Sequence, residues 1–421
     1  MTDAPVLMYP PGLPWDTMFQ RPHQLMKALA ELGYKCVFGQ NLHSLTGKPI
    51  NISAGSYMAP SGVHDNLELC FNCRRYMQDH QDEKVILYAS SGKLHAWADF
   101  LNPHALIYDE LDNFPNWERD AVIASIKADR IIYSAETLGE VVENRRKSYP
   151  EIAKATHVPT GGDFAHWNLS YKEPSIPKKV MYVGAFAAWL DFKNILGVVK
   201  GLPHYEFWFM GARFDAHPTT RVYVEELLHL PNVNAIQHIP YKFLPMLIAE
   251  ADALWIPFDV SERQLTLGDF VFPVSWITNY VNPCKFWEYL ATGKPIFYTG
   301  FDELRRIVTS LKKDYPHLPV WEYDDYVQAC RLMTRVLDDE VRGDYTDYSQ
   351  HSFIDAKAAA GVYTWERSAM IMAGVINDIM DSDLDAEAAE RAKLATERNK
   401  DPKKRPKFMG IKSPTQPKEL L

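Results

Sequence analysis

Residues 282–298 read Asn-Pro-Cys-Lys-Phe-Trp-Glu-Tyr-Leu-Ala-Thr-Gly-Lys-Pro-Ile-Phe-Tyr, a helical pattern that leads at once into an apolar strand. Pro283 suits the first turn of a helix, where its missing N–H would have no intrahelical partner. Gly293 suits the end of that helix, because glycine readily adopts the left-handed conformation found there. The stretch therefore predicts a helix–strand unit of the kind that builds α/β folds.

The same alternation of strand and helix extends outward in both directions. Between most of the apolar runs lie helical patterns, such as the one carrying Leu25, Leu29 and Leu32. Alternation of this kind implies parallel sheets that are covered on both faces. The expected strands are 6–9, 36–38, 85–88, 105–108 and 130–133 in the first half, and 180–183, 205–210, 232–236, 253–258 and 295–298 in the second.

The chain length of 421 residues favours two domains, since one hydrophobic core rarely grows beyond roughly 250–300 residues. The region 158–179 is rich in proline and glycine and interrupts the alternation. We therefore predict two Rossmann-like, doubly wound parallel-sheet domains that face each other across a cleft. The expected divisions are a first domain at 1–165, a linker at 166–179, a second domain at 180–360, a C-terminal helix at 361–382 that packs back toward the first domain, and a charged, mobile tail at 383–421.

Bulk composition restricts the partners and the compartment. The formal net charge is -9, which argues against broad nonspecific binding to nucleic acid. The 5 cysteines are an odd number in a long chain, which favours a reducing cytoplasm over a disulfide framework. We see no signal peptide and no run of about 20 apolar residues. The basic segment 401–407 leaves open a peripheral contact with anionic membrane or nucleic acid.

The predicted helix that begins at Pro283 has the chemistry of a phosphate site. The first N–H groups of a helix lack intrahelical partners, and the helix dipole favours an anion there. Glu288 follows roughly one and a half helical turns later, where a carboxylate could accept hydrogen bonds from two ribose hydroxyls. The alternative is an ordinary amphipathic helix with Glu288 exposed to solvent, and the residue types alone leave both interpretations open.

The pattern P-x-K-x-x-E-Y-L-A-x-G-K-P at residues 283–295 resembles the donor-site segment of GT-B glycosyltransferases of the retaining family 4. The resemblance is to bacterial transferases of the teichuronic acid and exopolysaccharide type. It covers roughly residues 5 to 380, with its motifs in the expected order. The further matching segments are 14–25, 108–114, 158–163, 183–191, 230–233 and 239–245.

This resemblance implies a hexosyltransferase-type enzyme that moves a sugar from a nucleoside-diphosphate-sugar to an acceptor hydroxyl, with retention and without an essential metal. A UDP-sugar is the favoured donor, and a GDP-sugar stays open. The acceptor would be a glycan, a lipid-linked sugar or a modified DNA base. Two alternatives share the fold: a UDP-sugar epimerase and a noncatalytic sugar-binding relative. A dinucleotide-dependent oxidoreductase would need G-x-G-x-x-G after residues 6–9, where the chain has Pro-Pro-Gly-Leu-Pro.

The resemblance also nominates site residues. The second glutamate of the family's E-x7-E element corresponds to Glu288, whereas the first, which contacts the donor sugar in the family, corresponds to Tyr280, a departure from the family's pattern. Basic candidates for the diphosphate include Arg263. The predicted donor-binding residues are Glu288, Lys285, Pro283, Asn282, Gly184, Arg213 and Lys193. The predicted catalytic residues are Asp109, Asp112 and His23, the two aspartates because they follow the strand expected to end at Tyr108.

Overall fold

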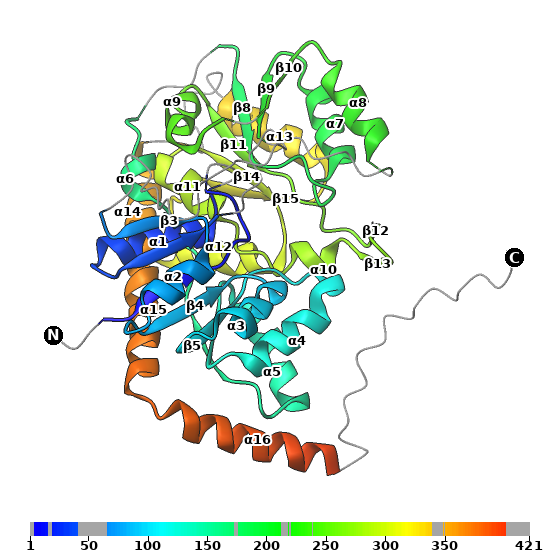
Figure 1. Ribbon diagram of the computed structural model, residues 1–421. Coiled ribbons are helices and arrows are strands. Elements are labelled where there is room, and N and C mark those ends of the chain that lie inside the picture. The colour runs from blue at the N-terminus through cyan, green and yellow to red at the C-terminus, as the bar shows by residue number, and fades with distance from the viewer. Residues whose placement is uncertain are drawn as a thin grey trace, which may run out of the picture.

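Two parallel sheets organise the molecule (Figure 1). The computed structural model describes residues 4–15, 19–40, 65–171, 176–211, 218, 220–237, 239–338, 348 and 350–400. Each sheet is built from strands that alternate with helices along the chain, so the predicted fold class is confirmed.

The N-terminal sheet has seven strands in the order β3-β2-β1-β4-β5-β6-β7. Alternate residues of its strands face opposite layers, as the two-residue period of a strand requires. Leu7 packs toward α1 and α15, whereas Val6 packs in the cluster that includes α2 and α4. The strands are β1 (Val6–Tyr9), β2 (Cys36–Gly39), β3 (Leu67–Cys70), β4 (Val85–Ala89), β5 (Ala105–Glu110), β6 (Arg130–Tyr133) and β7 (Lys154–His157). The helices are α1 (Arg21–Glu31), α2 (Cys73–Asp79), η1 (Gly92–His95), α3 (Ala96–Leu101), η2 (Pro115–Trp117), α4 (Glu118–Lys127), α5 (Glu136–Ser148) and α6 (Phe164–Trp167).

The second sheet has six strands in the order β10-β9-β8-β11-β14-β15. Its strands are β8 (Lys179–Val183), β9 (Glu206–Met210), β10 (Val233–Ile236), β11 (Ala253–Ile256), β14 (Ile296–Thr299) and β15 (Val320–Tyr323). Its helices are α7 (Phe192–Gly201), α8 (Arg221–Leu228), η3 (Tyr241–Phe243), α9 (Leu244–Ile248), α11 (Cys284–Thr292), α12 (Asp302–Asp314) and α13 (Tyr326–Leu337). In both sheets the order reverses direction at the first strand, which is where open α/β sheets bind ligands.

A small antiparallel hairpin interrupts the second half. It consists of β12 (Gln264–Leu267) and β13 (Phe270–Pro273), and the short helix α10 (Ser275–Thr278) follows it. Figure 1 shows the hairpin and α10 at the level between the two sheets. The amide of Asn113, in the first half, donates to the carbonyl of Trp276 over 3.0 Å, so this insertion touches both halves.

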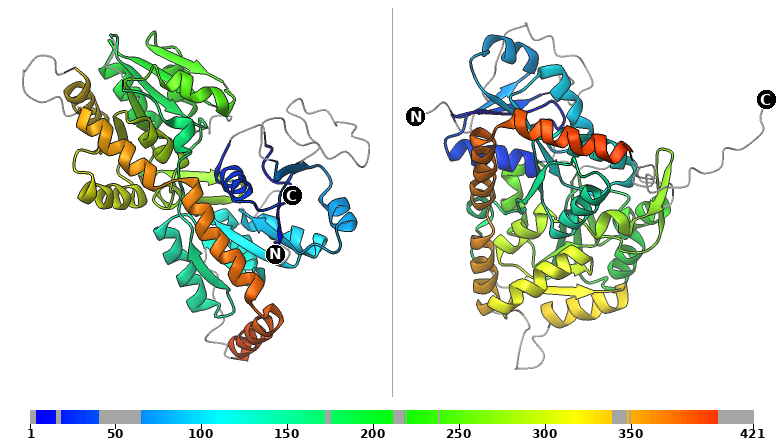
Figure 2. Two further views of the ribbon diagram at one scale, coloured as in Figure 1. Left: turned by 90° about the vertical axis from the view of Figure 1, so that its left-hand side faces the viewer. Right: turned by 90° about the horizontal axis from the view of Figure 1, so that it is seen from below.

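Three helices close the described chain: α14 (Gln350–Val362), α15 (Trp365–Asp381) and α16 (Leu384–Lys400). Figure 2 shows α14 and α15 running along one side of the molecule, past both sheets. α14 contacts α11, whereas α15 contacts α1 and buries Met372 and Ile376 in the N-terminal core. The chain thus returns to its first half, while the predicted domain boundaries themselves stay predictions.

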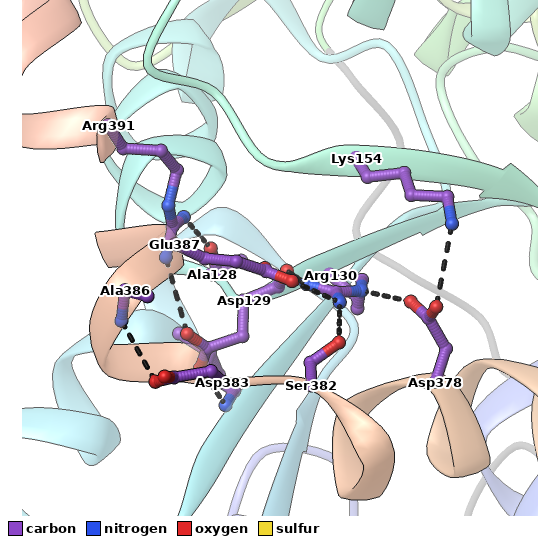
Figure 3. Close-up of polar contacts among 11 residues, drawn as sticks. Ala128, Asp129, Arg130, Lys154, Asp378, Ser382, Asp383, Ala386, Glu387 and Arg391 are labelled. Atoms are coloured by element: carbon purple, nitrogen blue, oxygen red, sulfur yellow. Dashed lines mark hydrogen bonds and ion pairs between the residues drawn. The ribbon is translucent and has the colours of Figure 1, made fainter. Parts of the chain in front are cut away.

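Residues 384–400, within the expected tail, form the helix α16, which the sequence did not predict, and the mobility of the tail stays a prediction. This helix buries no side chain, and its sequence accordingly lacks the apolar stripe from which a helix could be predicted. Polar contacts hold it instead, as Figure 3 shows: Arg130 binds Asp378 of α15 and Glu387 of α16, and Arg391 binds Asp129. Residues 401–421 lie outside the described part of the chain.

Candidate functional site

A cavity of about 440 Å³ lies between the two sheets, at the carboxyl ends of their strands. Both halves line it, as expected for a ligand cleft in facing Rossmann-like domains. The first half contributes Phe19, Gln20, Arg21, Leu111, Asp112, Phe114, Trp117, Ser134 and Thr160. The second half contributes Tyr182, Val183, Gly184, Ala185, Trp189, Met210, Gly211, Ile239, Tyr241, Leu244, Phe258, Ile277, Val281, Asn282, Pro283, Cys284, Lys285 and Glu288.

The helix α11 opens directly onto this cavity. Pro283 is its N-cap, in an extended conformation, and Gly293 is its C-cap with φ 76°. A Cβ on Gly293 would also lie 2.4 Å from the ring of Phe353, so glycine is required there by both conformation and space. Lys285 and Glu288 are three residues apart and therefore share one face of the helix, and both line the cavity. The predicted helix is present, and its two candidate side chains lie together at the cavity.

Lys285 is held in an aromatic setting. Its Nζ lies 3.1 Å from the hydroxyl of Tyr182, 4.5 Å from the centre of that ring and 5.0 Å from the centre of the Phe258 ring. Burial removes water from the ammonium group and lowers the pKa of Lys285 to about 8, although Glu288 opposes the shift. A cation with so little water around it would interact strongly with an incoming anion.

Glu288 is buried, and this excludes the alternative of an exposed carboxylate. Its Oε1 accepts a hydrogen bond of 3.1 Å from the hydroxyl of Tyr241. Burial raises the pKa of Glu288 to about 7, while the Tyr241 hydrogen bond and Lys285 lower it. A carboxyl group with a pKa near neutrality in a cleft marks a candidate functional residue.

Gly184 follows β8 and brings bare backbone to the cavity. Its φ is 146°, a conformation that side-chain-bearing residues rarely adopt. A Cβ here would lie 2.7 Å from Nζ of Lys285 and 2.8 Å from the hydroxyl of Tyr182. Glycine at this position therefore keeps space open beside the lysine, where a ligand could approach the main chain.

Asn282 lines the cavity, but its amide is already committed. Its Nδ2 donates to the carbonyl of Ser134 over 3.0 Å, and its Oδ1 accepts from Nε1 of Trp287 over 2.8 Å. The side chain therefore joins the start of α11 to the N-terminal half. These contacts position the helix, and the ligand role of Asn282 stays a prediction.

Of the other basic candidates, the structure describes Lys193 and Arg263, and neither lines the cavity with Lys285. Lys193 is exposed on α7 and is absent from the cavity lining, and Arg213 lies outside the described residues. Arg263 binds the carboxylate of Asp259 and the carbonyl of Ala188. Within the described lining, Lys285 and Arg21 are the basic side chains.

Asp109 and Asp112, the two aspartates predicted to follow one strand, differ in whether they reach the cavity. β5 continues to Glu110, so Asp109 lies inside the strand and not after it. Its carboxylate is fully buried and accepts hydrogen bonds from Arg21 (2.9 Å) and the hydroxyl of Tyr88 (2.6 Å). Asp109 does not line the cavity; it fixes Arg21, which does.

Asp112 does face the cavity, and within the described chain its carboxylate makes no hydrogen bond or ion pair with another side chain. Burial, reinforced by the negative charges of Glu110 and Asp109, raises the pKa of Asp112 to about 6. A carboxylate that has a raised pKa and no protein partner is available to a ligand hydroxyl or to its proton.

His23 is buried and absent from the cavity lining. Its Nδ1 accepts from the backbone N–H of Gln20 over 3.2 Å, so its Nε2 donates to the carbonyl of Pro14, also over 3.2 Å. Burial lowers the pKa of His23 to about 4. With both nitrogens engaged, the ring fixes the start of α1, and the geometry does not bring it to the proposed chemistry.

Sequence reasoning missed Arg21 and Tyr241 as site residues. Arg21 lies at the first position of α1, and its Nη1 also donates to the carbonyl of Pro159 over 3.0 Å. Tyr241 receives hydrogen bonds of 2.8 Å from Gln24 and from Trp167 and passes one to Glu288. Both lay within segments that the family resemblance had already marked, 14–25 and 239–245.

Comparison with solved structures defines the architecture. A glycosyltransferase from Rickettsia africae ESF-5 superposes with a TM-score of 0.59 at 12% identity, over 91% of this chain and 100% of that one. HepE from Anabaena, solved with UDP and glucose, gives 0.59 at 12% identity, over 89% and 100%. AviGT4, involved in avilamycin A biosynthesis, gives 0.52 at 15% identity, over 90% and 99%. The fold is therefore GT-B, the architecture of two facing Rossmann-like domains.

No protein-family model matches the chain, and no curated protein matches its sequence. Among the helices in the described ranges, none is long and apolar enough to cross a bilayer.

Proposed function

We propose that this protein is a glycosyltransferase that moves a sugar from a nucleoside-diphosphate-sugar to an acceptor hydroxyl. One observation carries the proposal: Lys285 and Glu288 lie on one buried face of α11 and point into the cavity between the two sheets. The GT-B fold, which solved glycosyltransferases share, supports it.

The start of α11 would hold the diphosphate. Its first N–H groups lack intrahelical partners, and Lys285 adds a poorly hydrated positive charge beside the bare backbone of Gly184. When the glycosyl bond breaks, negative charge grows on the diphosphate, so donors already in place stabilise the transition state. This accounts for the combination of a cation, a helix end and a glycine at one point.

Glu288 would bind the ribose. Its Oε1 already accepts from Tyr241, and its second oxygen is available to ribose hydroxyls. A nucleoside at Glu288 would lie near Met210, Gly211, Ile239 and Leu244, which line the same cavity. We favour uridine as the nucleoside, because HepE was solved as a complex with UDP, and keep guanosine as the second choice.

Asp112 and Glu288 are the carboxylates of the described cavity lining, so Asp112 is the proposed ligand for the reacting sugar or the acceptor hydroxyl. Tyr280, at the position of the family's first glutamate, does not line the cavity. The family 4 assignment, retention, hexosyl specificity and independence of metal are further parts of the proposal. So are a cytoplasmic location, an acceptor that is a glycan, a lipid-linked sugar or a modified DNA base, and peripheral membrane contact.

A thermal-shift screen with UDP, GDP, TDP and CDP tests the proposal. A ligand that binds only the folded state raises the melting temperature. We expect UDP to give the largest shift, Glu288→Ala to abolish most of it, and Glu140→Ala, at an exposed position on α5, to leave it unchanged. An equal shift in the two variants would show that the nucleotide binds elsewhere.

Incubation with donor, first alone and then with acceptors, distinguishes a transferase from an epimerase and from a noncatalytic sugar-binding protein. An isomeric free sugar nucleotide would identify an epimerase. No release of nucleoside diphosphate with any donor, with or without acceptors, would identify a sugar-binding protein that does not turn over.

A further inference from the structure

Three aromatic side chains of the cavity lining lie close to one another. Phe114 lies 4.4 Å from Trp117 and 5.9 Å from Trp189, measured between ring centres. All three are half-buried and line the cavity. Phe114 and Trp117 come from the N-terminal half and Trp189 comes from the second half. We call this group the aromatic wall.

The indole N–H groups of the two tryptophans of the aromatic wall are available to a ligand. Within the described chain, neither indole N–H of Trp117 or Trp189 has a hydrogen-bond partner. Asp112 lines the same cavity as Phe114 and also lacks a side-chain partner among the described residues. The aromatic wall and Asp112 together offer apolar ring surface, two indole donors and a carboxylate acceptor that have no side-chain partner among the described residues.

Hydrogen bonds hold the backbone that carries Trp189, and apolar packing supports Phe114 and Trp189. The guanidinium of Arg263 donates to the carbonyl of Ala188, and the N–H of Asp259 donates to the carbonyl of Trp189 over 2.8 Å. The hairpin β12–β13 covers the site from outside, since Leu265 and Phe272 cluster with Phe114 and Trp189. Rings supported by such contacts need less ordering when a ligand binds, which favours affinity.

The aromatic wall and Glu288 are connected to Lys285 through different neighbours. Lys285 contacts the ring of Phe258, and Phe258 pairs with Leu190, the residue after Trp189. Glu288 lies three residues further along α11 and accepts a hydrogen bond from Tyr241. We therefore place the nucleotide at Glu288 and Lys285 and a second ligand at the aromatic wall.

We propose that the aromatic wall is the subsite for a pyranose ring of a carbohydrate acceptor, an inference that rests on the proposed transferase function. A sugar ring presents an apolar C–H face, which packs on aromatic rings, and an edge of hydroxyls that need both donors and acceptors. The indole N–H groups and Asp112 supply both. A lipid tail would use the rings but leave these polar groups unpaired, at a cost in affinity.

Saturation-transfer NMR tests this directly, with the methyl glycosides of glucose, galactose, mannose and N-acetylglucosamine as probes. We expect transfer to at least one probe in the presence of saturating UDP, and a roughly fivefold weaker affinity in Trp117→Ala and in Trp189→Ala. Trp276→Ala is the matched control, because that ring is 46% exposed on α10 outside the cavity lining. The conservative changes Trp117→Phe and Trp189→Phe should retain part of the binding if ring packing contributes.

The outcomes separate this subsite from the donor site. Glycoside binding that persists in Glu288→Ala, while the UDP response is lost, supports both assignments. Glycoside binding without any response to the four nucleoside diphosphates would keep the aromatic wall and remove the donor assignment. No saturation transfer to any of the four probes, equal affinities in Trp189→Ala and Trp276→Ala, or displacement of the glycosides by uridine alone would overturn the subsite.

Discussion

The hydroxyl of Tyr241 lies 3.1 Å from Oε1 of Glu288, the proposed ribose carboxylate. The same hydroxyl accepts hydrogen bonds of 2.8 Å from the amide of Gln24 on α1 and from the indole N–H of Trp167. One oxygen thus donates once and accepts twice, which satisfies its full hydrogen-bonding capacity. Tyr241 is therefore placed to couple nucleotide binding to the position of α1.

Tyr241→Phe should destabilise the protein. It leaves the Trp167 N–H and the Gln24 amide without their acceptor, and an unpaired buried polar group costs about 1–3 kcal/mol. Denaturant unfolding of the unliganded protein measures the loss. Tyr326→Phe is the control, since Tyr326 is 45% exposed and its hydroxyl makes no hydrogen bond within the described chain. Equal unfolding free energies for the two variants would contradict the proposed network.

UDP affinity should fall as the pH rises from 7 to 9. In the protein without a ligand, burial lowers the pKa of Lys285 to about 8. Its ammonium group is therefore largely charged at pH 7 and largely neutral at pH 9. A diphosphate binds the charged form, and the affinity should therefore drop about tenfold over this interval. Calorimetric titration at several pH values measures it. Lys285→Met should bind weakly at every pH without this trend, and a parent affinity that is flat from pH 7 to 9 would remove Lys285 from the diphosphate site.

Glu288→Gln should stabilise the unliganded protein at alkaline pH. Burial raises the pKa of Glu288 from 4.5 to about 7, so the folded state resists ionisation that the unfolded state undergoes freely. The stability that this group contributes is complete below pH 4.5 and is lost as the pH rises through 7, a loss of up to about 3 kcal/mol. A glutamine side chain at this position would avoid the loss, because it does not ionise, and its amide oxygen could still accept from Tyr241.

We therefore expect Glu288→Gln to exceed the parent in unfolding free energy by about 1–3 kcal/mol at pH 8, and by much less at pH 4.5. Unfolding curves at the two pH values measure the difference, with the exposed Glu140→Gln as the control. A variant less stable than the parent at pH 8 would mean that the ionised Glu288 stabilises the folded protein, contrary to this prediction.

The sequence predicted the central strands because a strand buried on both faces is a short apolar run. β1, β4 and β11 are such runs, and their expected bounds were confirmed within two residues. Three edge strands were missed, since β3, β7 and β15 carry polar residues and have a neighbour on one side only. The hairpin β12–β13 was missed because it belongs to neither large sheet.

The site was predictable where one local segment forms it and not where distant segments meet. Lys285 and Glu288 share one helix, and Pro283 and Gly293 mark its ends. Asp109 was expected at the cleft, but it lies inside a strand and is paired with Arg21. A buried carboxylate needs such a partner, and the sequence could not identify it because Arg21 lies 88 positions away. The aromatic wall likewise joins Trp117 to Trp189 across the two halves, which no local pattern reveals.

The position of helix α16, which the sequence did not predict, is held mainly by one arginine of β6. Arg130 is 5% exposed and binds Asp378, Ser382 and Glu387, the residues on either side of the bend between α15 and α16. Arg130→Met would remove all of these contacts while keeping the buried alkyl volume. Because α16 buries no side chain, its remaining attachments would be mainly those of two arginines: Arg391 to Asp129 and the carbonyl of Ala128, and Arg398 to Glu151 and the ring of Tyr149.

Hydrogen exchange measured by mass spectrometry should therefore show α16 peptides exchanging faster in Arg130→Met, with β5 and α11 peptides unchanged. Arg146→Met is the matched control, because Arg146 forms only an exposed pair with Glu143 on α5. The pKa values of Asp378 and Glu387 are lowered by Arg130, so these contacts should persist at neutral pH and weaken in acid as the carboxylates become protonated. If exchange in α16 is the same in both variants, Arg130 does not hold the helix, and the contacts of Arg391 and Arg398 suffice to keep it on the N-terminal half.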